Sequence, residues 1–303
     1  MSVPPPARTI KMGFVVLSYS ENPLLVRLLS RLNQIYDEPP IVIHHDYSQA
    51  PLPVPEAQLT RNISVLRPYF LTRWGGFSVV EACLAAMEDL YQKHSPDWVM
   101  NLTASCYPIA AGSSVLCELS ETPCDAFIGA AMLFPQMKAP NELSIRRMDE
   151  ILLSPSLPTH TSDIATWMTA CYRRYVATEA SGTLFGPRFG CFAGDEFFII
   201  NSRAASALIS SRHAHPALVR HYSTVHAPDE SYYQTVLCNQ PELTISECNR
   251  RFANWHTPGA HPLDLTLSDF DRIVESGCYF ARKVSLEASL DLLDALDNWQ
   301  LCG

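Results

Sequence analysis

The sequence predicts an α/β fold, built as a doubly wound and mostly parallel sheet with helices on both faces. Short apolar runs rich in β-branched residues indicate strands, and longer runs with apolar residues at helical spacing indicate helices. The two kinds of segment alternate over roughly the first hundred residues, as they do in parallel sheets. The composition agrees, because 47% of the residues are hydrophobic and only 17% are charged, against about 25% charged in an average domain. We therefore expect a large core.

The predicted elements follow in order along the chain. Residues 14–18 form the first strand, and the turn at Asn22 and Pro23 leads into a helix over 24–32. Further strands are predicted at 41–43, 63–66, 98–102 and 197–201, and further helices at 78–91, 204–211, 230–237 and 290–299. Residues 133–189 interrupt this regularity with prolines and arginines, and we interpret them as an insertion or lid. We treat 1–303 as one domain, with halves at 11–132 and 190–303.

The charge balance excludes some classes of function. Lys and Arg number 22 and Asp and Glu number 31, which gives a net charge of −9, and a negative surface repels phosphate backbones. Bulk binding of nucleic acid is therefore not expected, although the insertion is locally basic. Its arginines include Arg146, Arg147, Arg173 and Arg174. We also expect no membrane span, because the longest uncharged stretch, 98–117, contains many polar residues.

The cysteines and histidines do not form a recognisable metal motif. Ten cysteines are scattered singly without a C-x-x-C pair, which favours reduced, mostly buried thiols over disulfides or zinc. The N-terminus shows no secretory leader, so we expect a cytoplasmic protein. His44 and His45 are neighbours on a predicted strand and would point to opposite faces. Fingerprints of dinucleotide binding, P-loops, serine hydrolases, zinc proteases and deaminases are missing from the sequence.

Five short patterns occur together in a fixed order. They are 41–46 (IVIHHD), 73–78 (RWGGFS), 97–102 (DWVMNL) with Tyr107 and Pro108 after it, 227–235 (APDESYYQT) and 279–283 (YFARK). This set resembles the core-2/I-branching glycosyltransferases, family fourteen of the carbohydrate-active enzymes, which also holds peptide xylosyltransferases and plant glucuronosyltransferases. The resemblance implies a GT-A-like fold and an inverting transfer from a UDP-sugar, without a cofactor or metal ion. Residues 11–132 would then bind the nucleotide-sugar, and 190–303 would form the acceptor and catalytic half.

The resemblance also assigns roles to single residues. Glu230 matches the catalytic base, and its place at the start of a predicted helix suits an acid at the edge of a cleft, although a first-turn carboxylate is also favoured by the helix dipole. Lys283 matches the lysine that binds the diphosphate, although it equally fits a solvated surface cation. Arg251 is similar to the arginine that accompanies this lysine, and Arg250 is the alternative.

Further donor contacts are implied near the start of the chain. Asp46 looks like the nucleoside contact, consistent with ligands that bind beyond the carboxyl ends of parallel strands, and it also fits a turn residue before Ser48. Trp74, Gly75 and Gly76 match a box near the donor site. Two adjacent glycines let the backbone approach a ligand closely, and a plain tight turn explains them as well.

The sequence departs from the family in two places. Where relatives carry Asp before Tyr-Pro, this chain has Cys106, so a carboxylate is missing near the donor site. Asp195 and Glu196 stand where relatives have an amide pattern before Trp, and with Asp229 we expect them to contact a different acceptor. The membrane anchor and luminal disulfides of animal members are not evident, which favours a soluble bacterial or phage-like relative.

The expected mechanism needs one base and two cations. Glu230 takes the proton of the acceptor hydroxyl, and Arg251 with Lys283 meets the charge on the departing UDP. The single D-x-D, at Asp269 and Asp271, begins a predicted helix, so we interpret it as capping rather than metal binding. Two alternatives stay open: an inactive relative that binds a sugar or nucleotide, and a glycosyltransferase acting on modified DNA bases. The donor sugar is of the GlcNAc, xylose, glucose or glucuronate class.

Overall fold

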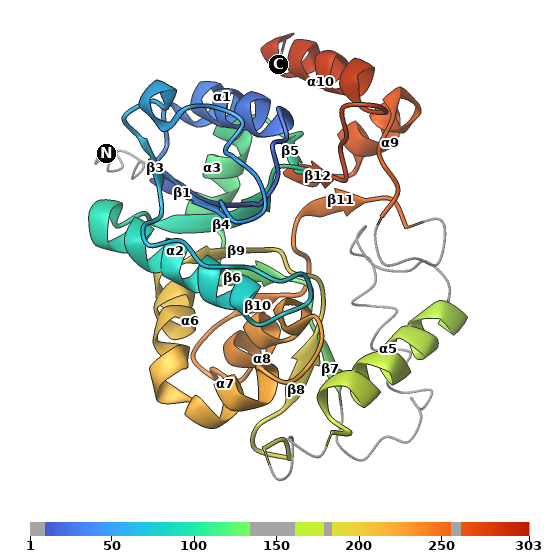
Figure 1. Ribbon diagram of the computed structural model, residues 1–303. Coiled ribbons are helices and arrows are strands. Elements are labelled where there is room, and N and C mark those ends of the chain that lie inside the picture. The colour runs from blue at the N-terminus through green and yellow to red at the C-terminus, as the bar shows by residue number, and fades with distance from the viewer. Residues whose placement is uncertain (1–9, 134–160, 179–183, 256–261, 303) are drawn as a thin grey trace, which may run out of the picture.

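The computed structural model describes residues 10–133, 161–178, 184–255 and 262–302, and Figure 1 shows their arrangement. The central sheet has the strand order β10-β6-β9-β4-β1-β2-β3. Its strands are β1 (Met12–Ser18), β2 (Ile41–His45), β3 (Ile63–Val65), β4 (Trp98–Thr103), β6 (Ala126–Ile128), β9 (Phe198–Asn201) and β10 (Ile245–Ser246). Of these seven, β9 runs antiparallel to its neighbours β4 and β6. The expected mostly parallel, doubly wound sheet is confirmed.

Helices cover both faces of this sheet (Figure 1). One face carries α1 (Leu24–Tyr36) and α3 (Gly112–Glu121), and the other carries α2 (Ser78–His94), α6 (Ser202–Ala214), α7 (Pro216–Tyr222) and α8 (Tyr232–Cys238). Side chains of a strand alternate between these layers: Phe14 and Val16 pack toward α1, and Val15 packs toward α2. The sheet is thus buried on both faces, which explains why its strands are nearly continuous apolar runs.

Two small sheets extend the central one. The first has the order β11-β12-β5 and consists of β11 (Arg251–Ala253), β12 (Phe280–Arg282) and β5 (Tyr107–Pro108). The second pairs β7 (Ala131–Leu133) with β8 (Cys191–Ala193). The sequence did not predict these two- and three-residue strands, because so short a run has no measurable periodicity.

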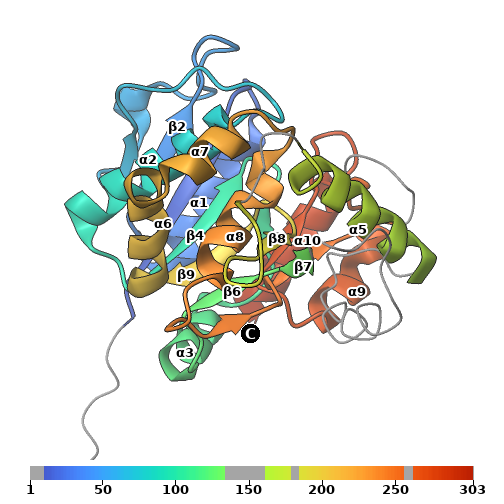
Figure 2. The ribbon, with the colours of Figure 1, turned by 90° about the horizontal axis from the view of Figure 1, so that it is seen from below.

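Several helices lie outside the main layers. They are α5 (Thr161–Tyr175), α9 (Phe270–Glu275), α10 (Leu290–Cys302) and the short 3-10 turns η1 (Glu56–Gln58), η2 (Pro228–Glu230) and η3 (Leu267–Asp269). Figure 2 shows α5 at the margin of the molecule, beyond α8, β7 and β8. It belongs to the predicted lid at 133–189, of which residues 134–160 and 179–183 lie outside the described residues.

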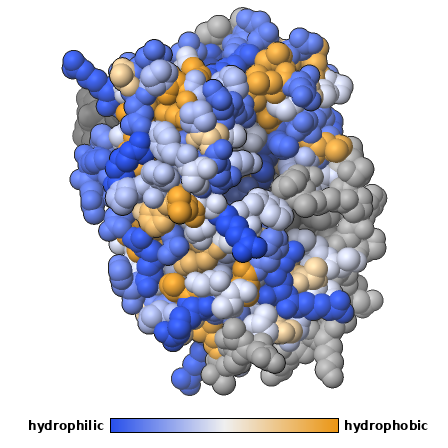
Figure 3. Space-filling model, in the orientation of Figure 1, coloured by the Kyte–Doolittle hydropathy of each residue, from blue (hydrophilic) through white to orange (hydrophobic). Residues whose placement is uncertain are grey.

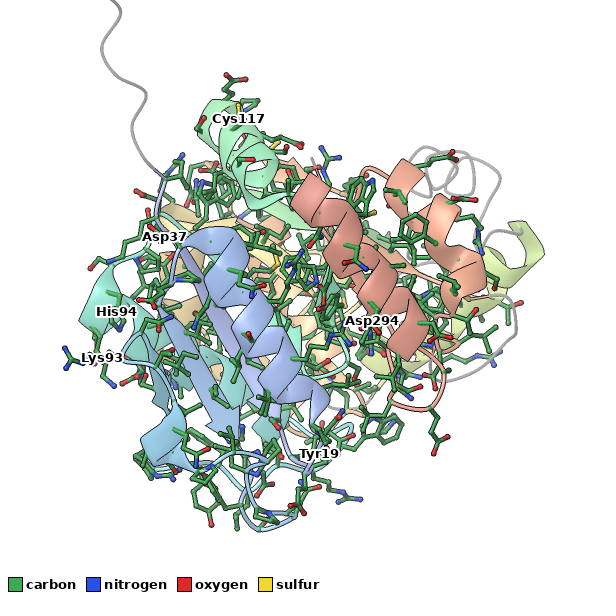
Figure 4. The ribbon with its side chains drawn as sticks, turned by 90° about the horizontal axis from the view of Figure 1, so that it is seen from above. Tyr19, Asp37, Lys93, His94, Cys117 and Asp294 are labelled. Carbon is green, nitrogen blue, oxygen red and sulfur yellow. The ribbon has the colours of Figure 1, made fainter. Side chains whose placement is uncertain are left out.

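The C-terminal helix α10 docks beside α1, as Figure 4 shows. The guanidinium of Arg27 on α1 lies 2.7 Å from Asp294 and 2.7 Å from Asp297 on α10. Leu292, Leu293 and Leu296 are fully buried beneath this polar contact. Apolar burial therefore supplies most of the docking energy, and the ion pairs fix the orientation of the helix. No described helix is long and apolar enough to cross a membrane.

Candidate active site

A pocket of about 280 Å³ opens beyond the carboxyl ends of β1 and β4. Loop residues after these two strands form one part of its wall, and the segment that follows β12 forms the other. Tyr19, labelled in Figure 4 near the first turn of α1, belongs to this wall. Figure 3 shows a hollow near the middle of the face seen in Figure 1. Crevices at this edge of an open α/β sheet are the usual place for ligands.

Lys283 lines this pocket together with Thr103 and Ser105. The backbone on either side of it is fixed, because Val284 donates a hydrogen bond to the carbonyl of Ser105 and Leu265 donates one to the carbonyl of Lys283. The side chain is 40% exposed, and its ammonium lies 3.6 Å from the carboxylate of Asp264. Such a loose, exposed ion pair contributes little energy, so the ammonium is free to meet an anion in the pocket.

Arg251 takes a different position from Lys283. Its side chain is only 1% exposed, and its guanidinium lies 4.1 Å from the centre of the Phe197 ring. One nitrogen donates to the carbonyl of Asn101 at 3.3 Å, whereas Nε and Nη1 have no partner. Burial lowers the pKa of Arg251. The two predicted cations therefore differ: Lys283 faces the pocket, and Arg251 is buried behind its wall.

Arg250, the alternative to Arg251, points elsewhere. Its guanidinium pairs with Glu118 on α3 and lies 5.5 Å from the ring centre of Tyr279. Arg282 instead accompanies Arg251, because its guanidinium lies 4.5 Å from the ring centre of Phe197. The ring of Phe197 thus has two arginines against it, an arrangement that cation–π attraction stabilises.

Glu230 lies at the end of the 3-10 turn η2 rather than at the start of an α-helix. The predicted helix 230–237 is wrong at its first residues, because Ser231 has an extended φ of −147° and α8 begins only at Tyr232. The Glu230 carboxylate is 35% exposed and forms an ion pair with Arg174 at 3.1 Å. Partial burial and the charge of Glu196 raise the pKa of Glu230 to about 7, and Arg174 opposes that rise.

The structure brings Glu230 together with three other predicted acids. Burial and the charges of Glu196 and Glu230 raise the pKa of Asp229, whose Oδ1 has no hydrogen-bond partner. Burial and Glu196 likewise raise the pKa of Asp195. We call Asp195, Glu196, Asp229 and Glu230 the acidic cluster. Like charges gathered at a partly dry site are typical of catalytic centres that move protons.

Besides Glu230, two further members of the acidic cluster are already engaged within the protein. Asp195 accepts hydrogen bonds from the backbone of Phe197, at 3.1 Å, and from the amide of Asn249. Glu196 pairs with Arg282 at 3.0 Å. Because Arg282 immediately precedes Lys283, this ion pair connects the acidic cluster with the wall of the pocket. The predicted acceptor contacts of Asp195, Glu196 and Asp229 stay predictions.

Asp46 is fully buried at the end of β2. Its carboxylate accepts hydrogen bonds from the backbone and hydroxyl of Ser48, from the side chain of Gln49 and from the backbone and hydroxyl of Thr72. Burial alone would raise the pKa of Asp46, but these donors hold it far below its ordinary value. The geometry is that of a turn-forming residue, and the nucleoside contact stays a prediction.

The Trp-Gly-Gly box contacts the loop that carries Glu230. The backbone N–H of Ala227 donates to the carbonyl of Gly75 at 2.9 Å, and the ring of Trp74, 65% exposed, lies 5.0 Å from that of His226. Gly75 has a φ of +69°, and a Cβ there would lie 2.2 Å from the imidazole of His226. Only glycine fits this position. Gly76 follows at the turn into α2, where its N–H donates to the carbonyl of Arg73.

The residues considered for metal binding have other partners. His45 lies 3.1 Å from the hydroxyl of Ser18, and the ring of His44 lies on the opposite side against the backbone of Phe70. Asp269 forms a capping box with Thr266, which agrees with the capping interpretation of the D-x-D. Within the described ranges, no three His, Cys, Asp or Glu side chains are grouped so that they could hold a metal ion.

Comparison with known proteins identifies the family. The sequence model described as Core-2/I-Branching enzyme matches residues 12–274. The chain belongs to this family of glycosyltransferases. It is 27% identical over 239 residues to beta-glucuronosyltransferase GlcAT14B of Arabidopsis thaliana. This alignment covers 77% of this chain and 51% of the relative. It is 24% identical over 265 residues to xylosyltransferase 2 of Rattus norvegicus, covering 80% of this chain and 28% of that protein. The chain thus spans about half the length of the plant relative.

Sequence reasoning missed three residues of this candidate site. Arg282 stands inside a motif that was recognised, but its partner Glu196 is 86 positions away. Arg174 was noticed only as part of a locally basic segment, and Phe197 only as a strand residue. A buried aromatic next to two acids is the one local signal that could have pointed to Phe197 as a support for arginines. Of the basic segment, Arg146 and Arg147 lie outside the described residues.

Proposed function

We propose that this chain transfers a sugar from a UDP-sugar to a hydroxyl group of an acceptor, with inversion at the anomeric carbon. The observation that carries the proposal is Glu230, a partly exposed carboxylate with a pKa raised to about 7. A general base works best when its pKa is near the working pH. The names of the relatives, a glucuronosyltransferase and a xylosyltransferase, support a sugar nucleotide as donor and favour uronic acid or pentose sugars within the expected class.

The reaction is a single displacement. Glu230 accepts the proton of the acceptor hydroxyl while the hydroxyl oxygen forms a bond to the anomeric carbon. The bond from that carbon to the UDP oxygen breaks on the opposite side, and its electron pair leaves with UDP. Negative charge grows on the diphosphate, and fixed cations placed where charge develops are worth most in the transition state. Lys283, at the pocket, is the first such cation.

Arg251 contributes from behind the pocket wall. Two of its nitrogens have no partner, and a buried guanidinium left in this way exerts a strong field because little water screens it. The Cys106 side chain lies nearby and is fully buried; it stands where the resemblance leads us to expect an Asp. The charges of Asp195 and Glu196 favour the ionised guanidinium of Arg251, and its two unbonded nitrogens support its use toward the leaving diphosphate. We further propose that no metal ion is needed and that the protein works in the cytoplasm.

The test is a panel of UDP-sugars, each mixed with the protein and with sugar or other hydroxyl-bearing acceptors, with UDP release as the readout. Release above the rate of spontaneous hydrolysis, for one donor and dependent on acceptor, is the expected result, and it should survive excess EDTA. Binding of UDP without turnover for any pair would favour the inactive binding relative instead. Activity that EDTA abolishes and Mn²⁺ restores would overturn the metal-independent part of the proposal.

A further inference from the structure

The last turn of α5 is fastened to the loop that carries Glu230. The hydroxyl of Tyr175 donates to the carbonyl of Ala227 at 2.7 Å, and the next residue toward the N-terminus, Arg174, pairs with Glu230 at 3.1 Å. Ala227 adopts a positive φ of 51° and donates its own N–H to Gly75. Two successive residues of one helix thus hold both ends of the short segment from Ala227 to Glu230.

The charges that face Glu230 come from four elements. The turn η2 supplies Asp229, the segment between β8 and β9 supplies Asp195 and Glu196, β12 supplies Arg282, and α5 supplies Arg174. Cys171 and Tyr175 on α5 are close as well, and burial raises the pKa of each. Glu196 already neutralises Arg282. Among these described groups, Arg174 is therefore the cation that directly contacts the Glu230 carboxylate.

We propose that Arg174 is a positioning residue that keeps Glu230 ionised and directs its free oxygen toward the acceptor; this inference rests on the proposed function. The ion pair engages Oε2, and Oε1 is the oxygen that takes the proton. Arg174 Nη1 also lies 3.4 Å from the hydroxyl of Tyr175, whose bond to Ala227 anchors the arginine. Helix α5 thereby acts on the chemistry through the charge of Arg174.

The experiment compares Arg174→Gln, Arg174→Lys and the control Arg173→Gln, which removes an exposed arginine from the same helix. The pH dependence of kcat/KM is measured for each, because its acid limb reports the pKa of the base in the free enzyme. An opposite charge at this distance lowers a carboxyl pKa by roughly one unit or more. Arg174→Gln should therefore shift the acid limb upward by about one pH unit. At pH values well below the limb, kcat/KM should fall by about tenfold, and above the limb it should fall only slightly.

The variants separate an electrostatic role from a structural one. Arg174→Lys should restore most of the wild-type limb, and Arg173→Gln should leave it in place. UDP affinity should be unchanged in all three. If kcat/KM of Arg174→Gln falls by the same factor at every pH and the acid limb does not move, Arg174 only holds the loop. If kcat/KM does not change at any pH, the ion pair is irrelevant. Either result overturns the proposal. If Arg174→Gln does not fold, as judged by circular dichroism, the neutral variant Arg174→Met takes its place in the same comparison.

A second readout keeps this inference distinct from the proposed function. Glutamate side chains labelled with ¹³C are titrated by NMR, and the Glu230 signal is assigned by its absence in Glu230→Gln. An upward shift of that titration in Arg174→Gln supports the electrostatic role even if no donor is turned over, in which case the proposed function fails alone. Turnover in the wild type with an unmoved Glu230 titration would overturn the role of Arg174 and leave the function standing.

Discussion

Asp46 at the end of β2 and Asp229 beside Glu230 each have a buried carboxyl oxygen, yet their pKa values are shifted in opposite directions. Asp46 accepts five hydrogen bonds and has a strongly depressed pKa. Asp229 has an oxygen without a partner and a raised pKa. Burial alone therefore does not decide the state of a carboxyl group. Donors aimed at Asp46 keep it ionised for the fold, whereas Asp229 lacks a donor at Oδ1 and lies beside the charges of Glu196 and Glu230, which raises its pKa.

The largest expected effect is at the reactive side of this comparison. Glu230→Gln keeps the size of the side chain and removes its basicity, so transfer should fall by about 10²–10⁴-fold. UDP affinity, measured by calorimetry, should stay within about twofold, since the diphosphate is expected at Lys283. Turnover close to the wild-type rate would remove Glu230 from the role of base.

Asp46→Ala tests the structural side. It leaves the partly buried donors of Thr72 without their acceptor, whereas those of the exposed Ser48 can turn to water. An unsatisfied buried group costs about 1–3 kcal/mol, so we expect a loss of about 1–3 kcal/mol in urea unfolding. In the wild type, the stabilising contribution of Asp46 is present above the ordinary carboxyl pKa and is lost as the pH falls below it, because the folded pKa is depressed. The exposed Asp291 provides the control: Asp291→Ala should cost only a few tenths of a kcal/mol.

Lys283→Ala tests whether the pocket binds a diphosphate. A hydrogen bond to a charged group is worth about 1.5–3 kcal/mol, and the partial exposure of this lysine places the expected loss of UDP affinity toward the lower value. Turnover should fall further than binding does, because charge on the leaving oxygens grows in the transition state. Lys93→Ala, on the exposed end of α2, is the matched control. Equal UDP affinity in both variants would exclude Lys283 as a diphosphate contact.

The smallest expected effect concerns Glu196. Its negative charge raises the pKa of Glu230, so Glu196→Gln should move the acid limb of kcat/KM to lower pH by up to about one unit. Arg282, left without its partner, acts in the same direction. The sign is opposite to that expected for Arg174→Gln. A shift to higher pH would mean that Glu196 acts mainly through the position of Arg282 rather than through its own charge.

Local patterns were sufficient for the regular part of the molecule. Short apolar runs rich in β-branched residues predicted β1, β2 and β4, and helical spacing predicted α1, α2 and α10, because each of these elements is decided by which of its own residues avoid water. Ordered motifs also singled out Glu230 and Lys283 through a family resemblance. The first turn of the helix predicted at 230 was wrong because Ser231 is drawn out of helical geometry by its contact with β8, where its hydroxyl donates to the carbonyl of Phe192.

Only the tertiary structure decided how the site residues meet. Glu230 and Arg174 are 56 positions apart, and Glu196 and Arg282 are 86 apart, so nothing local in the sequence specifies either ion pair. The sequence likewise could not predict that Arg251 is buried and Lys283 exposed, since both are cations in or next to short neighbouring strands. The sequence by itself determined which chemical groups are present and which segments fold regularly. The packing of β11, β12, η2 and α5 determined their pKa values, because those depend on distance and access to water rather than on residue type.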